Sequence, residues 1–379
     1  METVNVLSVL LGRKKVGTLA VYQKHITAFE YSDEWLETGF SISPFVLPLV
    51  KKVFLPKLQP FDGLFGIFSD SLPDGWGRLL VDRMLRKNGI DPATVNMLNR
   101  LAIVGSSGMG ALTYYPEHIT EHVSVLKDYD ALAKACADIL RNESTDDLDT
   151  LFLLGGSSGG ARPKIFATVD DEDWIVKFPA SADRRDIGAV EYLYSECAKR
   201  CGIEMSETRL FPSKTCEGYF GTKRFDRIKS PDGSVHRIHV ASVSALLETS
   251  HRVPNLDYST LLALTLKLTG SYTETEKMFR LMCFNVYAHN RDDHSKNFSF
   301  LFDETSGKWR LSPAYDLTYS NSLGGEHATC VNGNGLDPGL KEMLFLAETI
   351  GIKKSKAKQI AEQVEDTVHE ALGDISQYR

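Results

Sequence analysis

The sequence has no long hydrophobic run, no excess of positive charge and no paired cysteine motif, and each absence excludes a class of protein. The most apolar segment, residues 42–54, is interrupted by serine, proline and lysine, so it is too short to span a membrane. A net charge of −7 over 379 residues argues against bulk electrostatic binding of DNA or RNA. The six cysteines form no CxxC pair, and no basic stretch leads into an apolar run after Met1. We therefore expect a cytoplasmic protein with reduced thiols.

The order of the hydrophobic patterns predicts an α+β protein with two or three structural units. Alternating patterns typical of strands dominate up to about residue 60, and periodic helices dominate from about residue 240. Charged residues and helix formers over 117–148 predict a connector. The predicted parts are an N-terminal β/α subdomain with this connector (residues 1–140), a β-rich lobe (141–227) and a helical lobe (228–379).

The stretch from residue 289 to 316 contains the residue types that phosphoryl transfer requires. Asp292 can accept a hydroxyl proton, and Asn297 can offer an amide oxygen to a metal ion. An apolar run and a turn predict a β-hairpin after Asn297, which would return Asp316 to the same end. Oxygen ligands of this kind suit Mg²⁺. The spacing predicts Asp292 as the catalytic base, Asn297 and Asp316 as metal ligands, and Tyr315 beside the cofactor.

A glycine-rich turn at residues 155–164 precedes two predicted strands. Glycines expose backbone N–H groups to phosphate oxygens, and lysines on adjacent strands add positive charge. Lys177, on the second strand among apolar residues, is predicted to bind phosphate, with Glu191 or Glu196 of the next helix as its partner. The residues of the turn predicted to contact the cofactor are Gly159, Gly160, Ala161, Arg162 and Lys164.

Other interpretations of the glycine-rich segments are weaker. Residues 155–159 match the G-x-S-x-G pattern of hydrolases, but no helix is expected directly after the serine. The lysine of the turn is not followed by the serine or threonine of a Walker A motif. A second glycine-rich segment, residues 105–111, has no following lysine, so we expect a tight turn between strand segments there. His236, His239 and His251 are too scattered to predict a zinc site.

Taken together, these segments resemble the HipA family, the serine/threonine kinase toxins of bacterial toxin–antitoxin modules. The similar segments are residues 61–77 (N-terminal subdomain), 159–164 (phosphate loop), 223–227 (hinge) and 290–298 (catalytic loop). The resemblance covers nearly the whole chain. It implies a bilobal protein-kinase-like fold with an added N-terminal subdomain.

The resemblance also implies roles by position. His294 and Lys296 would lie by the nucleotide, and Lys177 would bind the ATP phosphates. The residues that would frame the adenine are Lys223, Arg224 and Phe225. The inhibitory autophosphorylation serine of the family falls on Ser157, with Ser158 adjacent to it. The chain departs from the family where Lys223 replaces the usual glutamate and where residues 239–243 lack a Gln-Glu-Asp run.

Three functional hypotheses follow. The first is an ATP- and Mg²⁺-dependent protein serine/threonine kinase that acts as a growth-inhibiting toxin on a protein such as an aminoacyl-tRNA synthetase. The resemblance implies a HipB-like helix-turn-helix antitoxin as its partner, with DNA contacted mainly through the antitoxin. The second hypothesis is a non-catalytic, nucleotide-binding co-repressor scaffold. The third is a small-molecule phosphotransferase, because such enzymes share the Asp-x4-Asn pattern.

Overall fold

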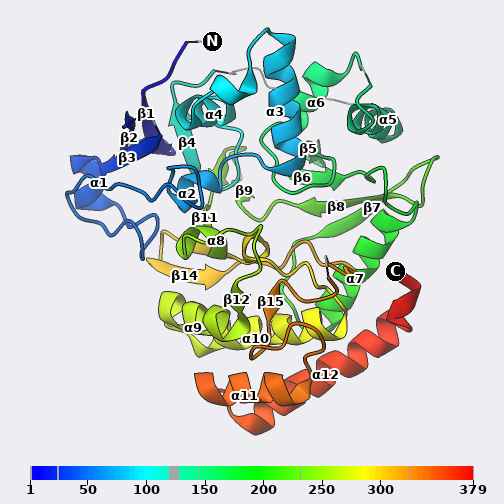
Figure 1. Cartoon of the computed structure of the whole chain (residues 1–379). Helices are drawn as coiled ribbons and strands as arrows, with labels where there is room; N and C mark the ends of the chain where they lie inside the picture. The colour runs from blue at the N-terminus through cyan, green and yellow to red at the C-terminus, as the bar shows by residue number, and fades with distance from the viewer. Residues whose placement is uncertain are drawn as a thin grey trace. The chain divides into compact units, whose positions relative to one another are not determined.

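The computed structural model describes residues 2–23, 25–118, 128–143, 145–230, 232–322 and 324–378. Their contacts divide the chain into two compact units (Figure 1). Unit 1 contains residues 1–188, 210–241 and 245–249, and unit 2 contains residues 189–209, 242–244 and 250–379. The boundaries predicted at residues 140 and 227 remain predictions. Part of the predicted connector, residues 119–127, lies outside the described residues.

The first sheet of unit 1 is antiparallel and has the order β3-β2-β1-β4. Its strands are β1 (Val6–Leu11), β2 (Lys14–Tyr22), β3 (Ile26–Tyr31) and β4 (Leu112–Tyr115). Alternate residues such as Leu7, Val9 and Leu19 are fully buried, as expected for a sheet with one face on a core. A tight turn at residues 12 and 13 joins β1 to β2. Two short helices follow, α1 (Asp33–Thr38) and α2 (Gly66–Ser69).

The second sheet of unit 1 has the order β5-β6-β8-β7. Its strands are β5 (Lys164–Val169), β6 (Glu172–Lys177), β7 (Thr208–Phe211) and β8 (Tyr219–Lys223). The first two are the strands predicted after the glycine-rich turn. One core joins its apolar residues to the helices α3 (Gly75–Lys87), α5 (Tyr129–Leu140) and α6 (Leu148–Gly155), with Trp76, Ile139 and Phe152 among its members. Helix α6 was not predicted from the sequence.

Smaller elements of unit 1 complete the description. Helix α4 (Met97–Val104) leads into the glycine-rich segment 105–111, so the expectation of a strand before that turn was wrong. A two-stranded hairpin, β9 (Arg227–Lys229) with β10 (Val235–Arg237), follows the predicted hinge. The remaining short elements are η1 (Pro92–Thr94), β11 (His239–Ser242) and α8 (Val243–Leu246), of which β11 and α8 continue into unit 2.

Unit 2 is mainly helical, as the sequence predicted. Its helices are α7 (Ile187–Arg200, which begins in unit 1), α9 (Tyr258–Thr269), α10 (Tyr272–Tyr287), α11 (Leu340–Ile350) and α12 (Lys354–Leu372). Helix α10 contacts α9 and α12, and α11 packs on α12. The predicted hairpin is present as β13 (Ser299–Asp303) and β14 (Lys308–Leu311), and it packs on α9 and α10. The short strands β12 (Leu256–Asp257) and β15 (Thr329–Cys330) pair in parallel, and η2 (Ser295–Asn297) and η3 (Ile375–Tyr378) are 3-10 turns.

The structure also bears on the expected absence of a membrane-spanning segment and on the states of the cysteines and His239. Among the described residues, no helix is both long and apolar enough to cross a bilayer. All six cysteines are free thiols, and Cys197 on α7 and Cys201 directly after it are buried. His239 is fully buried, and burial lowers its pKa to about 4, so it packs as a neutral ring.

Candidate active site

The catalytic loop of unit 2 begins where helix α10 ends. Ala288 caps the helix, and His289 adopts a left-handed backbone with φ of +56°, which turns the chain out of the helix. Asp292 then projects its carboxylate outward, with 62% of the side chain exposed. The Asn297 Nδ2 group donates to the Asp292 carbonyl oxygen at 2.7 Å. This bond closes the Asp-x4-Asn segment into one tight loop, as its spacing predicted.

The β-hairpin brings the third predicted residue back to this loop. Ser312 N donates to Ser299 O at 2.9 Å, which extends the hairpin pairing toward its open end. The Tyr315 hydroxyl donates to Lys296 O at 2.6 Å and lies 2.6 Å from Ser299 Oγ. Asp316 follows with φ of +55°, a conformation that aspartate tolerates better than most residues. Within unit 2, the hairpin therefore ties the Tyr315–Asp316 corner to the residue before Asn297.

The donor set at this corner fits a hard divalent cation. Because the Asn297 amide nitrogen is fixed on the Asp292 carbonyl, its Oδ1 atom faces the other way and stays an acceptor. An amide oxygen and the Asp316 carboxylate leave positions open for water and phosphate oxygens, which is how proteins commonly bind Mg²⁺. Among the described residues, no group of three or more His, Cys, Asp or Glu side chains forms a metal site.

His294 lies beside the predicted base. Its Nδ1 accepts from Lys296 N at 3.3 Å, so a neutral ring carries its proton on Nε2. That Nε2 atom is 3.9 Å from Asp292 Oδ1. The centre of the His251 ring is 5.5 Å from that of His294, a neighbour that the sequence pattern did not predict. One imidazole thus lies close to the exposed carboxylate, and a second imidazole lies beside the first.

The phosphate loop of unit 1, from here on taken together with the two serines before it as residues 157–164, packs on the start of helix α3. Asp74 is the N-cap of this helix, but its carboxylate accepts from Gly160 N instead of capping the helix. Trp76 N donates to Gly160 O at 3.0 Å. A Cβ atom on Gly77 would lie 2.3 Å from Ser158 O, so only glycine permits this contact. Helix α3 and the phosphate loop therefore touch through their backbones.

Two lysines face each other at the end of this loop. Lys164 on β5 and Lys177 on β6 are directly opposed in the antiparallel register, so their side chains share one face of the sheet. Lys164 is buried and its Nζ donates to Gly159 O at 2.6 Å, and Lys177 Nζ lies 5.5 Å from the Phe220 ring centre. Like charges in opposed positions repel each other. The two side chains place positive charge beside the loop, which suits a phosphate site.

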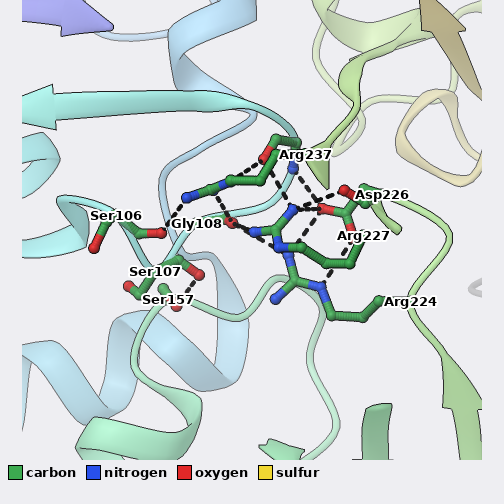
Figure 2. Close-up of polar contacts among 9 residues, drawn as sticks. Ser106, Ser107, Gly108, Ser157, Arg224, Asp226, Arg227 and Arg237 are labelled. Atoms are coloured by element: carbon green, nitrogen blue, oxygen red, sulfur yellow. Dashed lines mark hydrogen bonds and ion pairs between the residues drawn. The ribbon is translucent and has the colours of Figure 1, made fainter. Parts of the chain in front are cut away.

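The two serines of the loop are both buried. Ser157 Oγ donates to Ser107 O at 3.1 Å, as Figure 2 shows, and Ser158 Oγ donates to Gly155 O at 2.6 Å. Ser107 belongs to the glycine-rich segment 105–111. This segment was predicted to be only a tight turn. In the structure it also supports the phosphate loop, because Ser107 accepts the hydrogen bond from Ser157.

Three arginines fix segment 105–111 in turn (Figure 2). The guanidinium groups of Arg224, Arg227 and Arg237 donate to the carbonyl oxygens of Ser106, Gly108 and Gly110, and the first two also bind the carboxylate of Asp226. Burial lowers the pKa of Arg227 to about 9 and that of Arg237 to about 10. Burial alone would raise the pKa of Asp226, but Arg224 and Arg227 hold it well below its usual range.

The remaining predicted residues take the following places. Arg162 pairs with Asp183 at 3.0 Å, and Lys223 pairs with Glu172 at 3.0 Å. The Arg224 guanidinium is buried in the arginine cluster, and its backbone N–H donates to Asp173 O at 2.8 Å. Gly159 and Ala161 are exposed, and Phe225 is half-buried. The adenine contacts expected of Lys223, Arg224 and Phe225 stay predictions.

The structure thus assembles two groups of predicted residues, one in each unit. Unit 1 holds Ser157 to Lys164, Lys177 and the hinge, and unit 2 holds Asp292 to Asn297, Tyr315 and Asp316. Both candidate partners of Lys177, Glu191 and Glu196, lie on α7 in unit 2, and Glu191 is buried. The choice between them remains open.

The sequence analysis missed the residues that support the phosphate loop, above all Asp74, Gly77 and Asp226. The available signal was the sequence Asp-Gly-Trp-Gly at 74–77, in which two glycines stand inside the first turn of a helix. Glycine is costly there unless another backbone approaches closely.

Comparisons with known proteins identify the family. A HipA N-terminal domain matches residues 7–115, and a HipA-like C-terminal domain matches residues 156–372. The chain is 27% identical over 353 residues to Y4mE of Sinorhizobium fredii, a protein named as a candidate kinase, covering 83% of this chain and 77% of that protein. The fold resembles HipA of Shewanella oneidensis MR-1, solved with HipB and operator DNA, with a TM-score of 0.72, 17% identity and coverage of 98% of this chain and 91% of that chain. The predicted α+β, kinase-like fold is therefore confirmed, and the chain belongs to the HipA family.

Proposed function

We propose that the protein is an ATP- and Mg²⁺-dependent kinase that phosphorylates serine or threonine of a protein. The observation that carries the proposal is the arrangement in unit 2: an exposed Asp292 carboxylate, an Asn297 amide oriented by the same loop, and Asp316 returned by the hairpin. Phosphoryl transfer needs a positioned base and oxygen ligands for magnesium, and little covalent help from the protein.

Each residue then has a distinct task in the transfer. Asp292 accepts the proton of the acceptor hydroxyl while the new P–O bond forms and the bond from the γ-phosphorus to the bridging oxygen of ATP breaks, so ADP leaves. Asn297 and Asp316 would hold Mg²⁺, which neutralises charge on the phosphate oxygens. Lys164 and Lys177 present positive charge to the phosphates, and the nearby imidazole of His294 keeps Asp292 in a polar setting.

The family and the fold support a role as a toxin with an antitoxin partner. The Shewanella HipA structure contains HipB and operator DNA. By analogy, the partner proposed for the present chain is a HipB-like antitoxin, with DNA contacted mainly through it. The proposed substrate is a translation-related protein such as an aminoacyl-tRNA synthetase.

Autophosphorylation in the phosphate loop is part of the proposal. Because the hydroxyls of Ser157 and Ser158 are buried and bonded to backbone carbonyls, either serine must leave its place before it can accept phosphate. A phosphoserine carries nearly two negative charges and would not fit back against the Ser107 or Gly155 carbonyl oxygen. The modified loop would therefore stay in a form unable to cradle ATP.

The test is phosphate transfer by the purified chain. Wild type incubated with Mg²⁺-ATP should gain phosphate in intact-mass measurements, and peptide mapping should place it on Ser157 or Ser158. Asp292→Ala should lose transfer by roughly 10²–10⁴-fold while still binding nucleotide. Glu304→Gln, at an exposed turn of the same unit, serves as the matched control and should behave as wild type.

Two results would contradict the proposal. One is equal transfer by wild type and Asp292→Ala. The other is transfer to small hydroxylated molecules with none to protein, which would favour a small-molecule phosphotransferase. Phosphoproteomics after expression of wild type and Asp292→Ala would identify the protein target.

A further inference from the structure

A buried polar network lies directly beside the exposed base. Asp293, the residue after Asp292, has a fully buried carboxylate. Its Oδ2 accepts from the Tyr258 hydroxyl at 2.8 Å and lies 2.9 Å from His327 Nδ1, and its Oδ1 accepts from Thr329 N at 3.1 Å. A carboxylate removed from water needs donors of this kind. Adjacent aspartates thus differ completely in their surroundings, since one faces solvent and the other is an internal anchor.

The direction of the hydrogen bonds follows from the groups at the end of the network. The Asn290 Nδ2 group donates to Asn285 Oδ1 at 3.0 Å, so the Asn285 Nδ2 group faces the Tyr258 hydroxyl, 2.9 Å away. That hydroxyl accepts from Asn285, and its own proton goes to Asp293. Burial raises the pKa of Tyr258 well above its usual value, so the proton stays in place at neutral pH. Asp293 Oδ2 therefore accepts from both Tyr258 and His327, and the proton of the second hydrogen bond is on His327 Nδ1.

The same residues join two segments that both carry predicted site residues. Thr329 Oγ1 donates to the Asp293 carbonyl oxygen at 2.5 Å, and Ala328 N donates to Arg291 O at 3.0 Å. Further along, Ser320 N donates to His289 O at 3.0 Å. Residues 320–329 follow Asp316 in the chain, so these bonds fasten the segment after the metal ligand to the backbone on both sides of Asp292.

We propose that Asp293 and His327 are positioning residues that fix the direction of Asp292 and its relation to Asp316. This inference rests on the proposed kinase function, because the hydrogen bonds of Asp293 and His327 are assigned a role in phosphoryl transfer. Both side chains are buried, so the role assigned to the pair requires no contact with substrate or metal. It acts by preventing the catalytic loop and segment 317–329 from moving independently, and a misplacement of about 1 Å at a reacting group costs up to roughly 10²-fold in rate.

The experiment compares three variants of the full chain. His327→Leu removes the donor and keeps an apolar side chain of similar volume. His327→Asn keeps an N–H donor near the position of Nδ1, and Tyr258→Phe removes only the second donor to Asp293. The measurements are kcat and KM for ATP with the phosphorylated serine as readout, thermal unfolding, and amide hydrogen exchange over residues 289–297.

We expect His327→Leu to lower kcat by about 10–10²-fold with KM for ATP changed by no more than about twofold, and to speed exchange over residues 289–297. His327→Asn should restore most of the rate, and Tyr258→Phe should give an intermediate loss. A His327→Leu protein that unfolds at the wild-type temperature and keeps the wild-type kcat would overturn the proposal. So would equal losses in His327→Asn and His327→Leu, because they would show that an N–H donor at this position does not restore the rate.

The exchange measurement separates this inference from the proposed function. If wild type transfers no phosphate, the kinase proposal fails, whereas the mechanical coupling still predicts faster exchange in His327→Leu. Should exchange over residues 289–297 be unchanged in a folded variant, the coupling is absent whatever the activity. If His327→Leu does not fold, Tyr258→Phe and His327→Asn carry the same comparison with smaller structural changes.

Discussion

The phosphate loop and the catalytic loop are held in place by different parts of the sequence. Gly160 of the phosphate loop donates to Asp74, 86 residues earlier, whereas Asn297 of the catalytic loop donates to the carbonyl of Asp292, five residues earlier. The phosphate loop also contacts segment 105–111 through Ser157. That segment is held by Asp226 and three arginines from residues 224–237. The first loop therefore depends on remote residues of unit 1 for its own seat, whereas the second is closed by a local bond and is then anchored through Asp293 to Tyr258, His327 and Thr329.

The largest expected effect comes from removing the charge at the centre of the remote support. Asp226→Asn leaves Arg224 and Arg227 buried without their carboxylate, and breaking one partner of a buried ion pair costs about 3–5 kcal/mol. Urea denaturation should show this loss of unfolding free energy. Asp303→Asn, on an exposed turn, should change it by less than about 1 kcal/mol. A cost for Asp226→Asn as small as that of the control would mean that the cluster does not hold segment 105–111.

Lys177→Met should separate function from stability in the phosphate loop. Loss of a positive charge at the phosphates should lower kcat/KM by roughly 10²-fold. Thermal unfolding, measured alongside, separates loss of the charge from loss of the fold. Lys229→Met, at an exposed strand of the same unit, is the control for charge alone. Equal rates for the two variants would remove Lys177 from the site.

Adding a single methyl group at Gly77 tests the backbone contact between helix α3 and the phosphate loop. Gly77→Ala would bring Cβ to 2.3 Å from Ser158 O, so the loop must shift. Overpacking of this kind costs about 1–3 kcal/mol, and if this cost falls on nucleotide binding, affinity should drop by roughly 5- to 10²-fold. Gly339→Ala meets only an ordinary contact at 3.7 Å and serves as the matched glycine control. Calorimetric titration with ATP provides the measurement.

The smallest effect is a pH dependence of stability in unit 1. Burial raises the pKa of Glu248 to about 7, although its Oε1 accepts from Gly66 N at 2.7 Å. Because the folded state binds this proton more tightly than the unfolded chain, stability should fall as pH rises from about 4.5 to about 7. Glu248→Gln keeps the acceptor and removes the titration. Its unfolding free energy should therefore decline less than that of wild type between pH 5 and 8, and parallel declines would contradict this assignment.

The same contrast explains what could be predicted from the sequence. The strands and long helices follow from local periodicity, and the Asp-x4-Asn loop with its hairpin is a short-range pattern, so the bond between Asn297 and Asp292 and the contact of Tyr315 with Lys296 could be anticipated. The support of the phosphate loop is not local. Nothing in the glycine-rich turn indicates that Asp74 would bind Gly160 or that Ser107 would accept from Ser157, because these contacts depend on how α3 and segment 105–111 pack. Helix α6 was missed for a related reason, since its apolar residues are short in extent and end in the glycines of the loop.

The most direct test of the proposed centre is the magnesium dependence of nucleotide binding. ATP affinity would be measured by titration with and without Mg²⁺ for wild type, Asp316→Asn and Asp303→Asn. Magnesium should tighten ATP binding to wild type and to Asp303→Asn, and this gain should disappear in Asp316→Asn. The same magnesium-dependent gain in folded Asp316→Asn would contradict a metal site built from Asn297 and Asp316.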